Sequence, residues 1–490
     1  MITTLADLLP LLPLLIATAT TIVAMTAIGI RRNYALTAGI TIAGLLIASL
    51  VAASTMFTSN SQVTPLLIVD QYSLFFTVLT CVTAMLIAIF SFPYLANLDD
   101  SKEEYYLLLG IATIGAIVMV SSNHFVSTIL GLETLSMSLY GMVAYPVHSK
   151  LADKFPLEAS VKYLVLSAVA SGILLFGMAL IYAQTGTLEF SSIVNVTKET
   201  PGLGAGFSIV ALIMVFIGIA FKLSLAPFHM WTPDVYEGSP LPATIYLATI
   251  GKSAMFVVLL RLIVTTEALS FDSIILAISL VAIVSILAGN LLALLQDSLK
   301  RILAYSSIAH MGYLLLALVA SYYVQGTISV EAVTFYLFAY MVMSVGAFGV
   351  ISIVSSSEKE FDDIDDYQGL FWRNPWLAAV FTGMLLSLAG IPLTVGFIGK
   401  FYLFFSGVEA GLWILLAVLI IGSGVGLYYY LRIVYRMLLS PKDGEGFNSG
   451  GSQHIGSHGV LAFLLALLLI LGVYPTPLVS IIETISLNIL

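Results

Sequence analysis

Ionisable side chains recur inside the long apolar stretches of this sequence. Glu133, Lys222, Lys252, His310 and Lys400 each have mostly apolar neighbours over a helix-length window. A charged side chain at the centre of a bilayer costs roughly 2.5–3.5 kcal/mol on the insertion scale, so function or pairing must compensate for it. Groups of this kind are typical of ion and proton pathways. The residue types therefore predict ion or proton transfer within a membrane.

The segment 218–242, GIAFKLSLAPFHMWTPDVYEGSPLP, concentrates these features. It begins as an apolar helix, places Lys222 inside it and interrupts it at Pro227 before an acidic turn. Proline removes a backbone donor and clashes with the carbonyl four residues earlier. A broken backbone in a bilayer needs protein or water around it, so the segment predicts a hydrated path. The pairing recurs at Pro392 and Lys400, and two such interrupted helices are typical of ion-translocating repeat proteins.

Glu133 lies in the stretch ILGLETLSMSLYG, where Ser136 and Tyr140 follow at helical spacing and make its face partly polar. Its expected partner is a buried lysine on another helix, and Lys222 is the predicted one. Burial favours a neutral lysine, whereas a nearby carboxylate favours the charged form. Movement of Glu133 relative to Lys222 could therefore switch the protonation of the lysine. The alternative is a static buried ion pair that fixes helix packing.

Two further lysines fall within predicted spans. Lys252 lies about halfway through its span with Thr249 on the same face, which predicts a functional role. The alternative is a lysine hydrogen-bonded to helix carbonyls. Lys162 lies about one turn into its span and follows Glu158 by four residues, the better order for a helical ion pair. Snorkelling to the membrane interface is the alternative for Lys162.

His310 lies in RILAYSSIAHMGYLLLAL with Ser306, Ser307 and Tyr313 on its face. This hydroxyl-rich stripe surrounds a side chain that titrates near neutral pH, which predicts a proton relay. The alternative is a histidine that is simply hydrogen-bonded.

The other titratable groups are judged by their neighbours. Lys400 follows Gly396 and Gly399, which allow close helix approach, but the glycines do not explain the lysine, so a functional role is predicted. His124 and His229 lie near span ends and are predicted at the membrane interface.

Composition fixes the class of protein. Of the 490 residues 60% are hydrophobic and 9% are charged, whereas soluble proteins carry about a quarter charged residues. Apolar runs near the ~20 residues needed to cross a bilayer recur along the chain. The sequence predicts an all-α polytopic membrane protein with about fourteen spans, at roughly 8–28, 34–54, 72–92, 104–121, 124–145, 158–184, 205–230, 240–264, 271–294, 299–320, 330–356, 376–405, 410–438 and 458–485.

Orientation follows from the basic residues. Of the 18 Lys and Arg, twelve adjoin loops after odd-numbered spans, four lie within spans, and only Lys198 and Arg261 adjoin loops after even-numbered spans. Both termini are therefore predicted on the outer side. The first residues, MITTLADLLPLLPLL, lack the positive region of a signal peptide and are predicted to form a retained helix.

Several functions are excluded by what the sequence lacks. The single cysteine, Cys81, cannot hold an iron–sulfur cluster and is predicted to be buried. There is no Gly-rich phosphate loop or metal-ligand set, and the net charge of −9 argues against nucleic acid. The acidic loop Glu358–Asp366 and the Gly/Ser-rich loop Lys442–Gly459 are predicted to be solvated linkers, or else a docking surface for another subunit. The energy must come from an ion gradient or a partner protein.

At these residues the chain resembles the antiporter-like membrane subunits of respiratory complex I, the bacterial NADH–quinone oxidoreductase, and most closely the N type. The matching stretches run from about 105 to 435 and include LGLETLSMSLYGMVAY, FKLSLAPFHMWTPDVYEGSP, LATIGKSAM, DSLKRILAYSSIAHMGY and GIPLTVGFIGKFY. The chain ends after its fourteenth predicted span and lacks the long C-terminal extension of the L type, which favours the N type over the L type and leaves the M type as an alternative.

The resemblance implies two inverted five-helix repeats, at 104–264 and 271–438, with the seventh and twelfth helices broken. Segments 1–103 and 439–490 would carry the first three helices and the last loop and helix. By motif match, Glu133 and Lys222 would be the ion pair of the first half-channel, Lys252 the central lysine, and Lys400 the lysine of the second half. His310 would continue the polar axis between them, and Lys162 matches a position that also has a function in the family.

The implied function is a proton-translocating subunit of the complex in the bacterial cytoplasmic (inner) membrane. Its partners would be the other membrane subunits, lipids and protons, with no nucleic acid. No cofactor is expected in this chain, since NADH, FMN, iron–sulfur clusters and quinone would belong to partner subunits. The alternatives are a sodium/proton antiporter subunit, whose lysines would respond to sodium, and a non-pumping assembly scaffold, whose lysines would form inert pairs.

Overall fold

The computed structural model of this chain describes residues 5–57, 61–96, 98, 101–145, 155–191, 203–266, 271–324, 327–355, 360–441 and 455–487. Several predicted loop residues lie outside these ranges, namely Lys150, Lys154, Lys198, Glu358, Lys359 and 442–454 of the Gly/Ser-rich loop.

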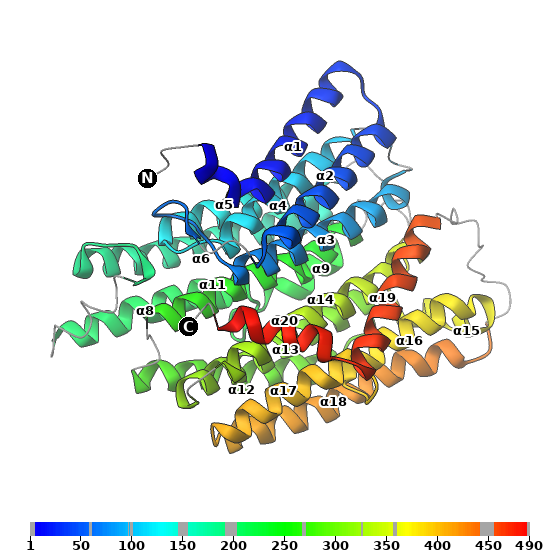
Figure 1. Cartoon of the computed structure of the whole chain (residues 1–490). Coiled ribbons are helices and arrows are strands. Elements are labelled where there is room, and N and C mark those ends of the chain that lie inside the picture. Colours follow the sequence, from blue (N-terminus) through cyan, green and yellow to red (C-terminus); the bar gives the residue numbers. More distant parts are fainter. Residues whose placement is uncertain are drawn as a thin grey trace.

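The described residues form a bundle of long helices that run roughly side by side (Figure 1). A short 3₁₀ helix, η1, and a two-stranded ribbon of β1 and β2 accompany them. The elements are η1 (Leu5–Leu11), α1 (Leu12–Ile30), α2 (Tyr34–Thr55), β1 (Ser61–Gln62), β2 (Ile68–Val69), α3 (Gln71–Leu95), α4 (Glu104–Val120), α5 (Phe125–Ala144), α6 (Pro156–Thr185), α8 (Leu203–Lys222), α9 (Trp231–Gly238), α10 (Leu241–Ala248), α11 (Ile250–Thr266), α12 (Asp272–Ala293), α13 (Leu299–Tyr323), α14 (Ile328–Val354), η4 (Ile364–Tyr367), α15 (Leu370–Arg373), α16 (Pro375–Ala389), α17 (Val395–Glu409), α18 (Trp413–Leu438), α19 (Ile455–Val473) and α20 (Thr476–Ser486).

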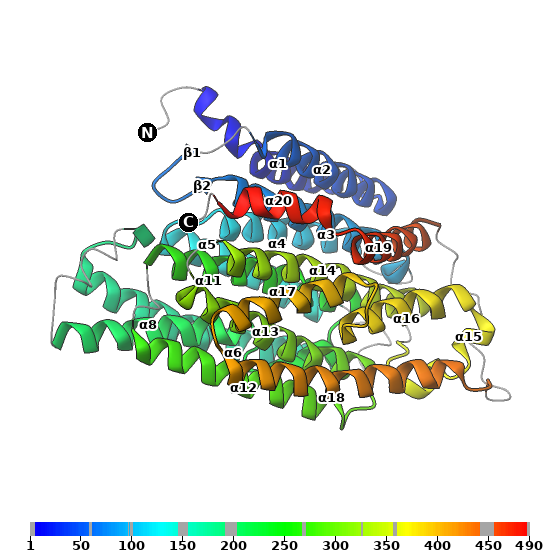
Figure 2. The ribbon, with the colours of Figure 1, turned by 60° about the horizontal axis from the view of Figure 1, so that its bottom comes forward.

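Each of the fourteen predicted spans contains at least one of these helices. In the described part of the chain, eleven helical segments are long and apolar enough to cross a membrane, and four shorter apolar helices accompany them. The prediction of an all-α polytopic membrane protein is therefore confirmed. Figures 1 and 2 show α1 and α2 at one edge of the bundle and α12 and α18 at the opposite edge.

The two predicted helix breaks are present, with one correction. The twelfth span divides at Pro392 into α16 and α17, as expected. The seventh span was expected to continue to Pro227 with Lys222 inside it, but α8 ends at Lys222 itself. Residues 223–230 are non-helical, and the Ala226 amide donates to Ser285 Oγ at 2.9 Å. The backbone groups freed by the break are thus satisfied inside the protein rather than in lipid.

Two further breaks were not predicted. The eighth span is interrupted at Thr249, between α10 and α11, three residues before Lys252. The last span was expected to be continuous but divides at Pro475 into α19 and α20, because proline cannot continue the hydrogen-bond ladder of α19.

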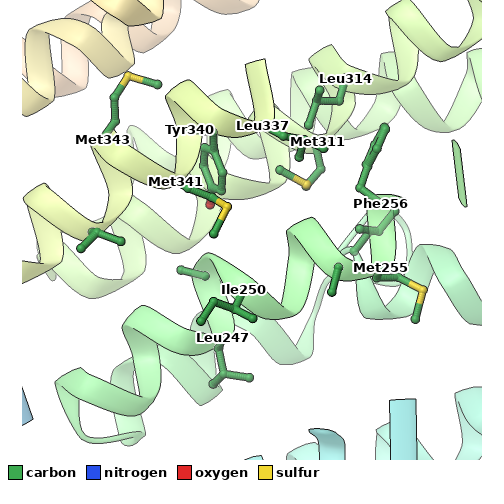
Figure 3. Close-up of a cluster of buried hydrophobic side chains, with 14 of the residues drawn as sticks. Leu247, Ile250, Met255, Phe256, Met311, Leu314, Leu337, Tyr340, Met341 and Met343 are labelled. Carbon is green, nitrogen blue, oxygen red and sulfur yellow. The ribbon is translucent and has the colours of Figure 1, made fainter. Parts of the chain in front are cut away.

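The apolar core extends through most of the bundle, and part of it lies where α10, α11, α13 and α14 meet. Figure 3 shows this cluster, with Leu247 and Ile250 from α10 and α11, Met311 from α13 and Met341 from α14. The central part of α13 is entirely buried, so its His310 cannot reach lipid. Cys81 is also buried, as predicted.

A buried ion pair joins α3 to α11. Arg261 Nη1 and Nη2 donate to the two carboxylate oxygens of Asp70 at 2.8 and 3.1 Å. Burial alone would raise the pKa of the Asp70 carboxyl, but the Arg261 guanidinium and hydrogen bonds from Ser73 hold the pKa below its ordinary value. Arg261 was expected beside an outer loop and is instead almost fully buried in α11, because Asp70 neutralises it there.

Replacing Asp70 with asparagine should destabilise the fold in a pH-dependent way. Removing one partner of a buried pair costs on the order of 3–5 kcal/mol. Because the pKa of Asp70 is lowered on folding, its stabilisation is complete above the ordinary aspartate pKa of about 3.9 and is lost as the pH falls through the lowered value. Thermal unfolding of wild type and Asp70→Asn should differ equally at pH 7 and 5 and less below about pH 4. A difference that grows on acidification would contradict this account.

A second buried ion pair joins Lys300 at the start of α13 to Glu360. Lys300 Nζ donates to Glu360 Oε2 at 2.5 Å and to the Ser239 carbonyl at 2.7 Å. Glu360 also accepts from Tyr94 OH and from the Leu241 amide. Lys300 was expected beside a solvated loop, and Glu360 was expected in the solvated linker 358–366. Both side chains are instead fully buried. The Lys300–Glu360 pair therefore links α3, α10 and α13 at one end of the bundle.

Candidate functional site

Lys222 is the last residue of α8, where unpaired helix carbonyls carry a partial negative charge. Its Nζ donates to Ser136 Oγ of α5 at 2.8 Å and to Ser167 Oγ of α6 at 2.5 Å. The residue is only 8% exposed. A buried ammonium is therefore held by neutral hydroxyl groups at a helix end.

Glu133 lies one turn before Ser136 on α5 and is half-buried. Its Oε1 accepts from Ser171 Oγ of α6 at 2.7 Å. The predicted direct ion pair between Glu133 and Lys222, both within the described ranges, is wrong, because serines occupy the contact positions of each charge. The Glu133 charge still acts on Lys222 through space.

Aromatic rings close the site around Lys222. Its Nζ lies 5.9 Å from the centre of the Tyr163 ring, which stacks on Trp231 of α9 at 4.9 Å. Trp231 Nε1 in turn donates to the Phe221 carbonyl at 3.1 Å. The chain after the break thus packs back on the end of α8 and satisfies one of its terminal carbonyls.

Lys252 lies in α11, three residues after the break at Thr249, and is 1% exposed. Its Nζ donates to Ser307 Oγ of α13 at 2.6 Å and lies 5.6 Å from the centre of the Tyr236 ring of α9. The Thr249 hydroxyl donates to the Ile245 carbonyl. The short helix α9 therefore presents Trp231 near Lys222 and Tyr236 near Lys252.

Buried hydroxyl groups without a hydrogen-bonding protein partner lie in the break at 223–230, on α9 and near the break at Thr249. Among the described residues they include Ser224 Oγ, Thr232 Oγ1 and Ser253 Oγ. Buried polar groups nearly always have a partner, and ordered water supplies one where side chains do not. His229, predicted at the interface, is instead buried in the break at 223–230. His124, also predicted at the interface, caps α5 and is half-exposed as expected. The region around α9 is thus suited to hold internal water.

His310 is buried in α13 and contacts two tyrosines from other helices. Its Nδ1 lies 2.6 Å from Tyr336 OH of α14, and its Nε2 lies 3.3 Å from Tyr430 OH of α18. The expected hydroxyl stripe is present but has other partners, since Ser306 bonds Tyr430 and Ser307 bonds Lys252. Either nitrogen of the ring has an oxygen with which to exchange a proton.

Lys400 lies on the second turn of α17 and is half-buried. Its Nζ donates to the Ala389 carbonyl, the last residue of α16, at 2.7 Å and to Ser423 Oγ of α18 at 2.9 Å. It lies 5.5 Å from the centre of the Tyr313 ring, which also packs edge-on against the ring of His310. Lys222 and Lys400 thus both lie at broken helices, but only Lys400 donates to the last carbonyl of the first half, whereas Lys222 is held by serine hydroxyls.

Gly390 separates α16 from this lysine and should not tolerate a side chain. Its φ is +88°, and an added Cβ would lie 2.7 Å from Lys400 Cδ. Gly390→Ala should therefore displace Lys400 and lower turnover, in addition to a backbone strain of about 1–2 kcal/mol. Gly411→Ala is the matched control, because Gly411 has φ +70° with no atom near its Cβ position. Comparing the activity of both variants checks this, and equal losses would show that strain alone is responsible.

Lys162 lies apart from the other predicted residues, with its side chain 44% exposed. It pairs with Glu158 at 2.9 Å, as predicted, and with Asp234 of α9 at 3.1 Å. Arg301 shares Asp234 at 3.0 Å. Burial would raise the pKa of the Asp234 carboxyl, but hydrogen bonds and charge from Lys162 and Arg301 hold it below its ordinary value. Lys162 and Asp234 line an open cavity of about 410 Å³, and Glu237 lines it as well.

Several neighbours were missed by sequence reasoning, namely Ser167, Ser171, Tyr236, Tyr336, Ser423 and Tyr430. A lone hydroxyl residue in an apolar helix carries little signal, because it can equally bond its own helix carbonyl. Within the described ranges, no group of three or more metal-ligating side chains gathers.

Comparison with known proteins places the chain in a family. Residues 122–426, which include all six predicted site residues, match the family described as NADH:quinone oxidoreductase/Mrp antiporter, TM. The NADH-quinone oxidoreductase subunit N of Methylococcus capsulatus (strain Bath) is 45% identical over 472 residues, covering 96% of this chain and 93% of that protein.

Solved structures have the same fold. A chain of respiratory complex I from Thermus thermophilus with bound Aureothin superimposes with a TM-score of 0.80 at 30% identity, covering 96% of this chain and 98% of that chain. A chain of the archaeal membrane-bound sulfane sulfur reductase (TM-score 0.85, 24% identity, 99% and 97% coverage) and one of the Mrp complex from a Dietzia species (0.82, 20%, 99% and 98%) share the fold alone. The chain therefore belongs to the family of transmembrane subunits of NADH:quinone oxidoreductases and Mrp antiporters.

Proposed function

We propose that this chain is an N-type membrane subunit of a bacterial NADH–quinone oxidoreductase and that it translocates protons. The 45% identity over nearly the whole length of such a subunit supports this assignment. The partners would then be the other membrane subunits of that complex. Glu133, Lys162, Lys222, Lys252, His310 and Lys400 are its proposed proton-handling residues.

The observation that carries the proposal is a contrast between two kinds of cation inside the helix bundle. Arg261 and Lys300 are buried against carboxylates and so are fixed in their charged forms. Lys222, Lys252 and Lys400 form no ion pair with any described residue and are held by hydroxyl and carbonyl oxygens. Losing a proton at these three lysines leaves no orphaned carboxylate behind. They can therefore cycle between charged and neutral forms, which a scaffold of inert pairs could not do.

The contacts suggest an order for the proton path. Lys222 and Lys252 flank α9, where the unpartnered hydroxyls are suited to bind a water chain. Lys252 bonds Ser307, which lies one turn before His310 on α13. His310 and Lys400 both contact the Tyr313 ring, so Lys400 ends the line. The Glu133 charge acts at the opposite end, on Lys222, and a change in its position or charge would bias proton uptake there.

The driving energy would come from other subunits. One buried cysteine leaves this chain without a thiolate set for a cluster. NADH, FMN, iron–sulfur clusters and quinone are therefore proposed to belong to partner subunits. The chain itself is proposed to have no oxidoreductase chemistry and to contribute proton transfer to the enzyme.

The proposed location is the bacterial cytoplasmic membrane, with both termini on the outer side. The bias of basic residues toward loops after odd-numbered spans supports this orientation. Protease or thiol-labelling access at engineered terminal sites in right-side-out vesicles would test it, and labelling only after inversion of the vesicles would contradict it.

A sodium test separates the proposal from its closest alternative, a sodium/proton antiporter subunit. Purified complex in proteoliposomes should take up protons during NADH oxidation at the same rate in choline and in sodium buffer. A protonophore should abolish the uptake in both. Pumping that requires sodium would instead favour the antiporter function.

A further inference from the structure

The helix α19 touches the break of the twelfth span through a glycine. A Cβ added at Gly472 would meet the Leu393 carbonyl oxygen and would lie 2.5 Å from Thr394 Cα. Both are backbone atoms, which cannot move aside as the end of a flexible side chain can. The backbone of the break thus packs directly against α19. The helix α19 also packs against α16 and α17.

The break that rests on Gly472 adjoins the residue that accepts a hydrogen bond from Lys400. Leu393 has φ +70°, an uncommon backbone conformation for a residue with a side chain, and that side chain is 68% exposed. Its own side-chain packing therefore does little to hold this conformation, and contacts of its backbone must do so. One side of the break is Ala389, whose carbonyl accepts from Lys400 Nζ at 2.7 Å. A shift of the 390–394 backbone would change the acceptor of the lysine.

We infer that Gly472 is a positioning residue, through which α19 holds the break at 390–394 and so fixes the site of Lys400. The inference rests on the proposed function, because it assigns Gly472 a role in proton transfer only through Lys400. The inference gives α19 a positioning role in the second half of the path, although α19 contributes none of the proposed proton-handling residues. Pro475 ends α19 two residues beyond Val473, so the contact is made at the very end of the helix.

The test compares Gly472→Ala with Gly459→Ala in the assembled complex. Gly459 lies on the same helix, and no atom lies within 4 Å of its Cβ position. Both alanines favour the helix equally, since alanine exceeds glycine in helix propensity. Gly472→Ala should lower NADH-driven proton uptake by roughly tenfold, because a misplacement of about 1 Å can cost up to a hundredfold. Gly459→Ala should behave as wild type.

A double-mutant cycle separates positioning from general damage. In a Lys400→Ala background, Gly472→Ala should cause no further loss of proton uptake, because its effect passes through the lysine. Leu393→Gly should partly rescue Gly472→Ala, since glycine lets the backbone retreat at φ +70° without strain.

Each outcome has one meaning. Normal pumping by Lys400→Ala would reject the proposed function of that lysine. Loss by Lys400→Ala with normal pumping by Gly472→Ala would reject the role of Gly472 alone. Additive losses in the double variant, or equal losses from both glycine variants, would show that Gly472 only packs the helices.

Discussion

Lys252→Ala should lower proton uptake and coupled NADH–quinone turnover by about a hundredfold, the usual contribution of a positioned proton-transfer group. Among Lys222, Lys252 and Lys400, which form no ion pair with any described residue, Lys252 is the most buried, and it connects α11 to Ser307 beside His310. Removing it interrupts the proposed path at its centre. Turnover and proton uptake are measured together in proteoliposomes, with equal assembly verified by native gels.

The matched control for Lys252→Ala is Met255→Leu on the same helix. Met255 lies in the buried apolar cluster, and this nearly volume-conserving change should cost less than about 1.5 kcal/mol and leave activity intact. Near-normal pumping by Lys252→Ala, or equal loss in both variants, would contradict a proton-transfer role for Lys252.

Lys300→Met should destabilise the chain by about 3–5 kcal/mol, because it leaves the Glu360 carboxylate buried without its cation. Among the described residues, Glu360 would then keep Tyr94 OH and the Leu241 amide as its donors. Adding Glu360→Gln should recover part of the loss, since an amide can still accept from Leu241 without carrying a charge. Thermal unfolding of the purified complex is the measurement. Single and double variants of equal stability would show that the pair is not coupled.

The two proline breaks were predictable because two local signals coincide there. A proline and a lysine within one apolar run cannot both be accommodated in a straight lipid-facing helix. The break at Thr249 has no proline or glycine at the broken residue, so its sequence reads as continuous helix. The position of the first break was misjudged for a related reason. The helix ends at Lys222, because Trp231 and Ser285 satisfy the freed backbone from elsewhere in the fold.

The site residues were identifiable, but their partners were not. A charge in an apolar run is conspicuous on its own, whereas Tyr336 and Tyr430 join His310 only through packing of α14 and α18 on α13. The same limit explains the error at Glu133, where serines intervene between two charges that sequence alone pairs. It also explains Arg261 and Lys300, whose burial depends on Asp70 and Glu360 far along the chain. The division into two inverted repeats stays a prediction.

The most direct test of the central claim is the ratio of protons taken up to NADH oxidised in proteoliposomes carrying Lys222→Ala, Lys252→Ala or wild-type complex. The account predicts that both variants assemble normally and lose proton uptake, either with turnover or without it. This prediction follows because Lys222 and Lys252 contact neutral hydroxyl groups rather than carboxylates, so that each is proposed to exchange its proton. Full turnover with the wild-type proton ratio in both variants would contradict the account and favour a structural scaffold.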